Sequence, residues 1–390
     1  MAENKDKKVL NVPHLRFPEF SGEWEKCKVS DLLDFYSTNS LSWEQLEYDT
    51  NSMMNLHYGL IHVGLPTMVD LAKDKLPNIK EDNMIKNFEL CKEGDVAFAD
   101  ASEDTNEVAK TIEFYNLAGI NVVCGLHTIH GRDNKHKTVV GFKGYAFSST
   151  AFHNQIRRIA QGTKIYSIST KNFSECYIGL PSKPEQTKIA TLLRLIDERI
   201  ATQSKIIEKL QSLIKGLAAQ LTQSGTPNIR LCDCLECHSS TLQENCVSVT
   251  GSYPVYGATG LIGYTNNYAY SGESILIVKD GSGVGSLSYV NDHFSIIGTL
   301  NYLTAKEKHS ILYLYYALMA FNFTPYITGM AIPHIYFKDY GKAKLFYPSN
   351  EKRIRITSLL HNIEQKLVVE QNLVISLSAQ KSYLLRMLFI

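Results

Sequence analysis

The sequence lacks the features of several common protein classes. No apolar run in its 390 residues approaches the roughly 18 residues that a membrane-spanning helix requires. The first eight residues are polar, whereas a signal peptide has an apolar centre. An excess of charge is also missing: 40 Lys and Arg face 39 Asp and Glu, and the net charge of +1 excludes a polycation but not a local basic surface. We therefore expect a soluble, cytoplasmic protein that binds no membrane and keeps its eight cysteines reduced.

Signatures of catalysis are missing as well. The sequence has no glycine-rich dinucleotide fingerprint, no Walker loop, no Asn/Asp-Pro-Pro-Tyr motif of adenine methyltransferases, no serine-nucleophile elbow and no paired-carboxylate nuclease pattern. We predict a non-catalytic protein that holds no cofactor and no metal ion of its own. A methyltransferase with a divergent active site is the alternative that these absences leave open.

What the sequence does contain is one pattern that occurs twice. Residues 162–200 and 329–367 align without a gap, and Gly162 and Pro181 each lie 167 residues before their counterparts, Gly329 and Pro348. Each copy ends in a long segment whose apolar residues recur at alternating steps of four and three. The repeat predicts a chain of two related halves, each with a long helix at its end.

The apolar positions of these segments predict two long helices, 181–222 and 347–390, that pair as an antiparallel coiled coil, with a linker at 223–227. One polar residue interrupts each apolar seam at the equivalent place. If the helices pair in register, these two residues meet and form a hydrogen bond; the alternative is that each side chain reaches water. The predicted seam residues are Ile189, Leu193, Ile196, Ile200, Gln203, Ile207, Ile356, Leu360, Ile363, Leu367, Glu370 and Val374.

The remaining sequence predicts a flexible tail at 1–11 and two globular domains at 12–180 and 228–346. Short apolar runs between Gly, Asn and aromatic residues favour mostly short antiparallel strands with some helices in both domains. A weak match also pairs 95–100 with 275–280, where an apolar strand leads into a small polar loop. The predicted fold class is α+β: two domains separated by two long antiparallel helices and related by an internal pseudo-two-fold repeat.

Several motifs together resemble the specificity (S) subunits of type I restriction-modification systems. They are the opening Leu15-Arg16-Phe17-Pro18-Glu19-Phe20, the glycine turns at Gly162 and Gly329 with the following Leu180-Pro181 and Tyr347-Pro348, and the stretch Tyr253-Pro254-Val255-Tyr256-Gly257. One departure concerns the start of the second helix. There Lys352-Arg353 stands where the first copy has Glu185-Gln186.

The resemblance implies two target recognition domains, each reading one half of a bipartite site on double-stranded DNA, with the helices setting the spacing. It also implies that the helices dock methyltransferase (modification) subunits and that motor and nuclease (restriction) subunits can join. S-adenosylmethionine, ATP and Mg²⁺ would then belong to those partners. The alternative from another class is a coiled-coil scaffold whose globular domains bind protein instead of DNA.

In the second domain, candidate DNA contacts lie on loops. The Gly-rich loop 279–285 follows an apolar strand and leads into another strand, which disfavours a phosphate cradle because such cradles precede a helix. A structural hairpin and a hairpin that approaches DNA both remain open. The candidates are Lys279, Asp280 and Ser282, with Tyr256, Asn266 and Asn267 on neighbouring loops.

In the first domain, the most basic loop is 127–137, which suits contact with phosphate. The alternatives are a solvated loop and a metal site of His127, His130 and His136, which the lack of an adjacent Cys or Glu disfavours. The candidate DNA contacts are Arg132, Lys135, Lys137 and His130, together with Asn55, His57, Tyr58, Ser102 and Lys164.

A cysteine-rich segment in the second domain invites a comparison with zinc sites. Its cysteines are Cys232, Cys234, Cys237 and Cys246, and their spacing is not that of a paired zinc knuckle. The segment also aligns with a cysteine-free strand start in the first domain. We therefore expect core thiols.

Overall fold

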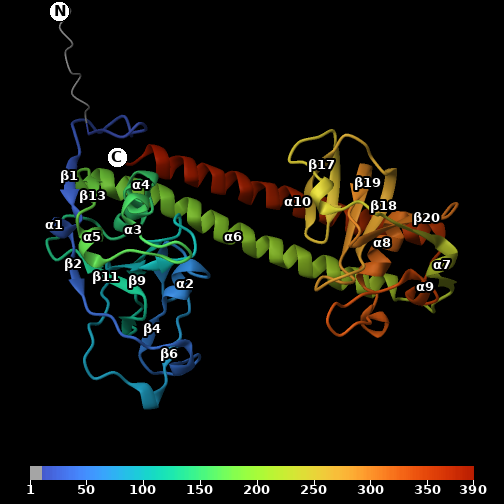
Figure 1. The fold of residues 1–390 in the computed structure, drawn as a ribbon, viewed down its shortest axis with the longest axis horizontal. Helices are drawn as coiled ribbons and strands as arrows, with labels where there is room; N and C mark the ends of the chain where they lie inside the picture. The colour runs from blue at the N-terminus through green and yellow to red at the C-terminus, as the bar shows by residue number, and fades with distance from the viewer. Residues whose placement is uncertain (1–10) are drawn as a thin grey trace, which may run out of the picture. The chain divides into compact units, whose positions relative to one another are not determined.

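The computed structural model describes residues 11–390 (Figure 1). The predicted tail lies outside the described residues except for Asn11. The chain forms two compact units: unit 1 holds the described residues up to Thr202 together with Leu373–Ile390, and unit 2 is Gln203–Asn372. Within the described residues, no helix combines the length and the apolar character that a bilayer crossing demands.

Unit 1 is built on a five-stranded sheet in the order β2-β11-β7-β9-β5, with a second sheet in the order β10-β4-β6-β3 and two strand pairs, β1-β13 and β8-β12. Most neighbours are antiparallel, but β5 pairs parallel with β9 and β10 pairs parallel with β4. The strands are β1 (Glu25–Lys28), β2 (Asp34–Tyr36), β3 (Leu46–Glu47), β4 (Met54–Leu56), β5 (Met68–Asp70), β6 (Asn78–Ile79), β7 (Val96–Ala99), β8 (Ala101–Ser102), β9 (Thr111–Asn116), β10 (Val122–Cys124), β11 (Thr128–Arg132), β12 (Tyr166–Ser167) and β13 (Tyr177–Leu180).

The short helices of unit 1 cover this sheet with aromatic side chains. Ser149 and Ser169 cap two of them, because each Oγ accepts a hydrogen bond from the backbone N–H three residues later, at 3.2 Å. Phe98 on the sheet lies 4.5 Å from Phe173 between ring centroids. The helices are α1 (Val29–Leu32), α2 (Tyr58–His62), α3 (Lys143–Phe147), α4 (Thr150–Ile159) and α5 (Thr170–Ser174), with 3₁₀ turns at Trp43–Gln45 and Glu81–Asn83.

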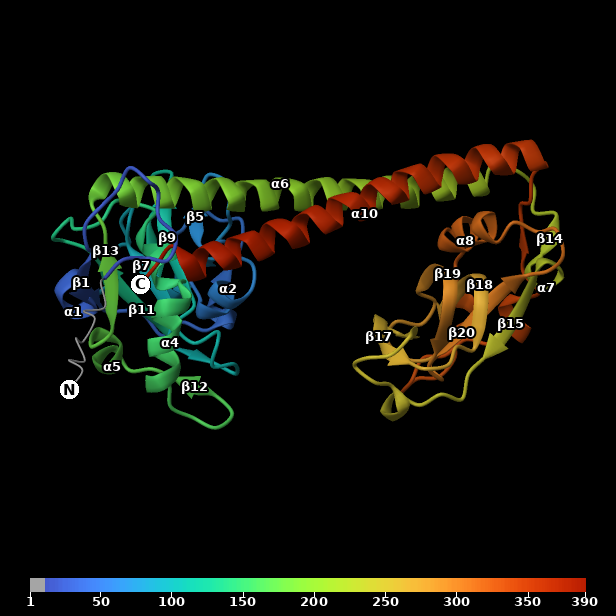
Figure 2. The same cartoon turned by 90° about the horizontal axis from the view of Figure 1, so that it is seen from above.

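Unit 2 contains a six-stranded sheet in the order β15-β20-β18-β19-β16-β17 and the pair β14-β21. The helix α8 packs on β18 and β19 (Figure 2). The pair β16-β19 is parallel. The strands are β14 (Ile229–Arg230), β15 (Leu235–Ser239), β16 (Tyr253–Gly257), β17 (Gly260–Thr265), β18 (Tyr270–Val278), β19 (Leu287–Ile296), β20 (Leu300–Ala305) and β21 (Lys344–Leu345). The helices are α7 (Leu231–Cys234), α8 (Ile311–Met319) and α9 (Phe337–Tyr340), with 3₁₀ turns at Glu244–Cys246 and Thr324–Tyr326.

The strands β7 and β18 hold corresponding places in the two units. In β7, Val96 and Phe98 belong to one hydrophobic cluster and Ala97 and Ala99 to another. In β18, Ile275 and Ile277 likewise belong to one cluster and Leu276 to another. Side chains alternate between the faces of a strand, so both strands are buried on two sides and hold the loops that follow them in place.

Two long helices, α6 (Lys183–Thr222) and α10 (Asn350–Met387), contribute to both units. In unit 1, Lys381 Nζ lies 2.7 Å from Asp197 Oδ1, and Leu193 shares a core with Leu384 and Leu388. In unit 2, Ala218 shares a core with Ile356 and Leu360. Early residues of α6 thus meet late residues of α10, and later residues of α6 meet early ones. Within each unit the helix segments run antiparallel.

The polar residues of the seam meet as expected, because Gln203 Nε2 donates a hydrogen bond to Glu370 Oε2. Every predicted seam residue is buried or half-buried. The α+β fold class with its long helices and internal repeat is confirmed. The three parallel strand pairs are an addition to the mostly antiparallel prediction, and they join segments far apart in the chain, as parallel pairing requires.

Candidate nucleic-acid interface

The repeated glycine turn forms the same hairpin in both units. In unit 1 the backbone groups of Gln161 and Ser167 exchange hydrogen bonds of 3.0 and 2.8 Å. In unit 2 the groups of Thr328 and His334 do so at 2.9 and 2.8 Å. Each residue of the second pair lies 167 positions after its counterpart, so the sequence repeat is also a repeat of backbone geometry.

Glycine is required at the start of both turns. Gly162 has φ of 138° and Gly329 has φ of 88°, which are values that residues with a Cβ rarely adopt. An added Cβ would lie 1.9 Å from the backbone oxygen of Ile165 in the first turn and 2.3 Å from that of Ile332 in the second. The tips of both turns are exposed, since Ile165 and Ile332 are 62% and 66% exposed.

Both hairpins are held against the loop that follows the central strand. The backbone N–H of Ile168 donates to Asp100 O at 2.9 Å, and that of Ile335 donates to Lys279 O at 2.9 Å. Asp100 follows β7, and Lys279 follows β18. We call residues 100–102 with 161–167 hairpin–loop surface 1, and residues 279–285 with 328–334 hairpin–loop surface 2.

The two surfaces gather five of the predicted DNA contacts. Surface 1 holds half-buried Ser102 and exposed Lys164. Surface 2 holds Lys279 and Asp280, which are half-buried, and exposed Ser282. Lys279 Nζ is 3.8 Å from Asp280 Oδ2, a separation that leaves its donors available to another partner. The glycine-rich loop leads into β19, as expected, and not into a helix.

A row of rings leads to surface 1, and sequence reasoning did not find it as a group. The ring centroids lie 4.4 Å apart for Trp43 and His57, 4.8 Å for His57 and Tyr58, and 5.2 Å for Tyr58 and His127. At its end, His127 Nδ1 lies 3.1 Å from Asp100 Oδ1. Trp43 is 43% exposed, and the presence of only two tryptophans in the chain was the one signal for it. We call these four residues the ring row.

Arg132 and His130 require a correction, because neither lies on a solvated loop. Both belong to β11, between β2 and β7, where every residue is buried. Arg132 donates to Asp95 at 2.8 Å and to Glu89 at 2.6 Å, while His130 Nε2 lies 2.7 Å from Asp95 Oδ2. These two side chains are too buried to contact DNA, so we assign them to the interior of unit 1.

Asp95 remains charged in this buried network. Burial alone would raise the pKa of its carboxyl group, but the hydrogen bonds from His130 and Arg132 outweigh burial and lower the pKa below its ordinary value. Burial also opposes the charge of Arg132, yet its bonds to Asp95 and Glu89 raise the pKa of the guanidinium group. The charges of the network are therefore paired and structural.

Asn55 and His57 are also buried, which corrects the expectation that they contact DNA. Asn55 accepts a hydrogen bond from Asn39 Nδ2 at 2.6 Å, and His57 Nδ1 accepts one from the backbone of Gly59 at 3.1 Å and so caps α2. Burial, and to a lesser degree the neighbouring His127, lower the pKa of His57. Tyr58 is half-buried and keeps a place in the ring row.

The remaining candidates lie outside the two surfaces. Lys135 is exposed and donates to Asp31 O at 2.9 Å, and Lys137 pairs with Glu25 at 3.2 Å. Asn266 and Asn267 are exposed after β17, whereas Tyr256 on β16 is half-buried against Phe294. The first four side chains can still reach a partner, and Tyr256 mainly packs.

Neither set of residues weighed for a metal ion forms a cluster of three ligands within residues 11–390. In the histidine set, His130 is buried while His136 is exposed. In the cysteine-rich segment, Cys234 is a buried core thiol and Cys246 is exposed. Burial raises the pKa of Cys234 to about 12, which keeps this thiol protonated and inert.

The comparisons with known proteins agree with this geometry. The model of the Type I restriction modification DNA specificity domain matches residues 74–212 and 229–377, which is well over half of the chain. A putative type I restriction enzyme specificity subunit of Haemophilus influenzae is 30% identical over 89 residues, or 22% of this chain and 23% of that protein. The type I restriction enzyme EcoprrI specificity subunit of Escherichia coli is 26% identical over 112 residues, or 29% of this chain and 28% of that protein.

These alignments span less than a third of each relative's length, but the likeness in fold is longer. The crystal structure of a type I restriction-modification S subunit from M. genitalium matches with a TM-score of 0.62 at 17% identity, covering 97% of this chain and 99% of that one. The first matched region of the family model ends within α6, and the second begins after the linker and ends within α10, so the two matches follow the two halves of the repeat. The chain therefore belongs to the family of the type I restriction-modification DNA specificity domain.

Proposed function

We propose that the chain is the DNA-specificity subunit of a type I restriction-modification complex and that each unit reads one half of a bipartite site on double-stranded DNA. The observation that carries the proposal is the repeated hairpin–loop surface. The two units keep the same backbone hydrogen bonds there while their exposed side chains differ. A shared backbone arrangement with different side chains suits two domains that recognise different DNA sequences.

The side chains on these surfaces have the chemistry of base and phosphate recognition. Carboxylates such as Asp100 and Asp280 accept hydrogen bonds from exocyclic amines of cytosine, and Ser282 can donate or accept. Lys164 and Lys279 suit phosphate or guanine. The exposed Lys135 and the half-buried Lys137 would add phosphate contacts, which position the duplex but do not select its sequence.

The long helices would act as the spacer between the half-sites. Each is continuous and contributes to both units, so its length limits the separation of the readers. We further propose that the helices dock methyltransferase subunits and that restriction subunits join this assembly. Apolar side chains stay exposed along both helices and suit such contacts; they include Leu195, Leu213, Ile354, Leu359, Val368, Val369 and Ile375.

On this proposal the chain performs no chemistry itself. S-adenosylmethionine, ATP and Mg²⁺ would be bound by the partner subunits, and the complex would act in the cytoplasm, where the DNA lies. The family match and the missing catalytic motifs support this division of labour.

The test is an exchange of recognition domains. The complex of this chain with its methyltransferase subunit should methylate a bipartite motif in cellular DNA, and the purified chain alone should transfer no methyl group. Replacing residues 12–180 with the matching segment of another family member should change one half of that motif and leave the other half intact. A change in both halves, or in neither, would contradict the proposal and favour a scaffold that binds protein.

A further inference from the structure

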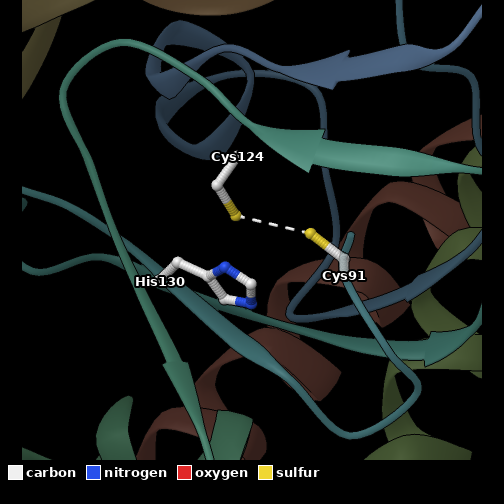
Figure 3. A group of neighbouring side chains, drawn as sticks. All are labelled: Cys91, Cys124 and His130. Carbon is white, nitrogen blue, oxygen red and sulfur yellow. Dashed lines mark hydrogen bonds between the residues drawn. The ribbon is translucent and has the colours of Figure 1, made fainter. Parts of the chain in front are cut away.

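Three side chains in the interior of unit 1 converge on one point without any role in the proposed function (Figure 3). Cys91 lies in the loop before β7, Cys124 ends β10, and His130 lies in the middle of β11. They are 5%, 2% and 0% exposed. The two Sγ atoms are 3.6 Å apart, and one ligand atom from each of the three residues lies within 4.8 Å of the others.

His130 presents one of its ring nitrogens without a hydrogen-bond partner. Its Nε2 is 2.7 Å from Asp95 Oδ2, so Nε2 carries the proton that this carboxylate accepts. Its Nδ1 is buried and has no partner, and Figure 3 shows that nitrogen facing the two sulfur atoms. A buried nitrogen left without a partner is costly, so the arrangement points to a missing ligand.

The geometry suits a tetrahedral metal ion. Zn–S bonds of about 2.3 Å place two thiolates about 3.8 Å apart, close to the observed separation. A carboxylate on the far nitrogen of a ligating histidine is the usual second contact around zinc, because it fixes the orientation and the protonation of the ring. Two thiolates and a neutral imidazole would also cancel the charge of Zn²⁺, which avoids an uncompensated buried charge.

We propose that Cys91, Cys124 and His130 bind one Zn²⁺ ion, with Asp95 orienting the imidazole of His130. Three protein ligands leave the fourth position to a water molecule. Cys124 also lines a small pocket together with Asn39 and Glu89. No covalent or redox step is involved.

The ion would add a link between the two sheets of unit 1, which also share a hydrophobic cluster. Cys124 belongs to the second sheet and His130 to the five-stranded sheet. The two ligands flank His127, the last member of the ring row. Zinc would therefore hold both ends of the segment that places His127 beside Asp100. Any effect of the ion on DNA recognition by surface 1 rests on the proposed function, whereas the metal site itself does not.

The test uses the full chain, produced without a metal-affinity tag and kept reduced. We expect about one Zn²⁺ per chain by elemental analysis. Exchange with Co²⁺ should give the charge-transfer and visible absorption bands of a thiolate-bound ion. Cys124→Ser should reduce the bound metal at least tenfold, and Cys176→Ser, at another buried cysteine of unit 1, should leave it unchanged.

Two results would overturn the proposal. One is a folded, reduced wild-type chain that holds no zinc and gives no cobalt bands; this measurement needs no variant and stands even if Cys124→Ser fails to fold. The other is a disulfide between Cys91 and Cys124 in protein isolated under conditions that preserve thiols. A chain that holds zinc but whose methyltransferase complex reads no DNA would refute the proposed function alone.

Discussion

The two units share a frame but differ in what they bury. Among residues 11–390, the charged side chains classed as buried all belong to unit 1; they are Asp95, Glu113, Arg132, Asp133, Lys143 and Glu185. Unit 2 instead builds its interior from tyrosines. Tyr315 and Tyr316 both donate to Glu364, at 3.2 and 2.7 Å, and Tyr313 and Tyr340 are almost fully buried.

This difference indicates that the repeat preserves the backbone geometry of the two units, whereas the side chains of their cores differ. The hairpins, the central strands and the long helices correspond between the units, whereas the cores use unlike chemistry. A buried ion pair is sensitive to the loss of one partner, while tyrosines that mix apolar contact with a hydrogen bond tolerate more. We therefore expect the units to respond differently to substitution in their cores and alike to substitution in their hairpins.

The largest expected effect is from Arg132→Leu. It leaves Asp95 and Glu89 without their cation, and breaking a buried pair costs about 3–5 kcal/mol. Urea unfolding of the full chain would measure this loss of stability, and hydrogen exchange would assign it to one of the two units. Unit 1 should lose protection and unit 2 should keep it. Lys135→Leu, three residues away and exposed, is the control; an equal loss from that variant would contradict the assignment of Arg132 to the interior.

The glycine turns test whether the hairpins are equivalent. Gly162→Ala and Gly329→Ala each force a Cβ against backbone at a positive φ, which should cost about 1–3 kcal/mol. Each should weaken recognition of one half-site only, as measured by binding of the methyltransferase complex to DNA with either half mutated. Gly216→Ala, on α6 with open space around its Cβ position, should be neutral or stabilising. Loss of both half-sites from one turn variant would show that the hairpins do not act independently.

The polar pair of the helices should have a smaller effect. Glu370→Leu leaves buried Gln203 without its acceptor, at a cost on the order of 1 kcal/mol. The double variant with Gln203→Leu should recover this loss, because two leucines leave no buried polar group without a hydrogen-bond partner. A double-mutant cycle by urea unfolding measures the coupling. Strictly additive single effects would mean that the hydrogen bond does not stabilise the seam.

The smallest effect on stability is expected at hairpin–loop surface 2. Lys279→Ala should change stability by less than about 0.5 kcal/mol. If Lys279 contacts a phosphate, the variant should lower the salt dependence of DNA binding by about one unit of slope. Lys344→Ala, an exposed lysine of unit 2 on β21, serves as the control. An unchanged slope would remove Lys279 from the interface.

Some residues could be placed from the sequence because their signals are local. The step of three and four along each helix predicted the seam, and the equal spacing of the two interruptions predicted the bond between Gln203 and Glu370. The same reasoning misplaced Arg132 and His130. A cluster of charges in sequence resembles a solvated loop, and only the pairing of β11 with two neighbouring strands shows that these side chains point into the interior.

By itself, then, the sequence determined the repeat, the two helices and the glycine turns, because periodicity and backbone conformation depend on residues close together in the chain. Only the tertiary structure decided which charges are buried, how the ring row forms and where two cysteines 33 residues apart meet a histidine. Those contacts follow from the order of strands in the sheets, and no spacing along the chain specifies that order.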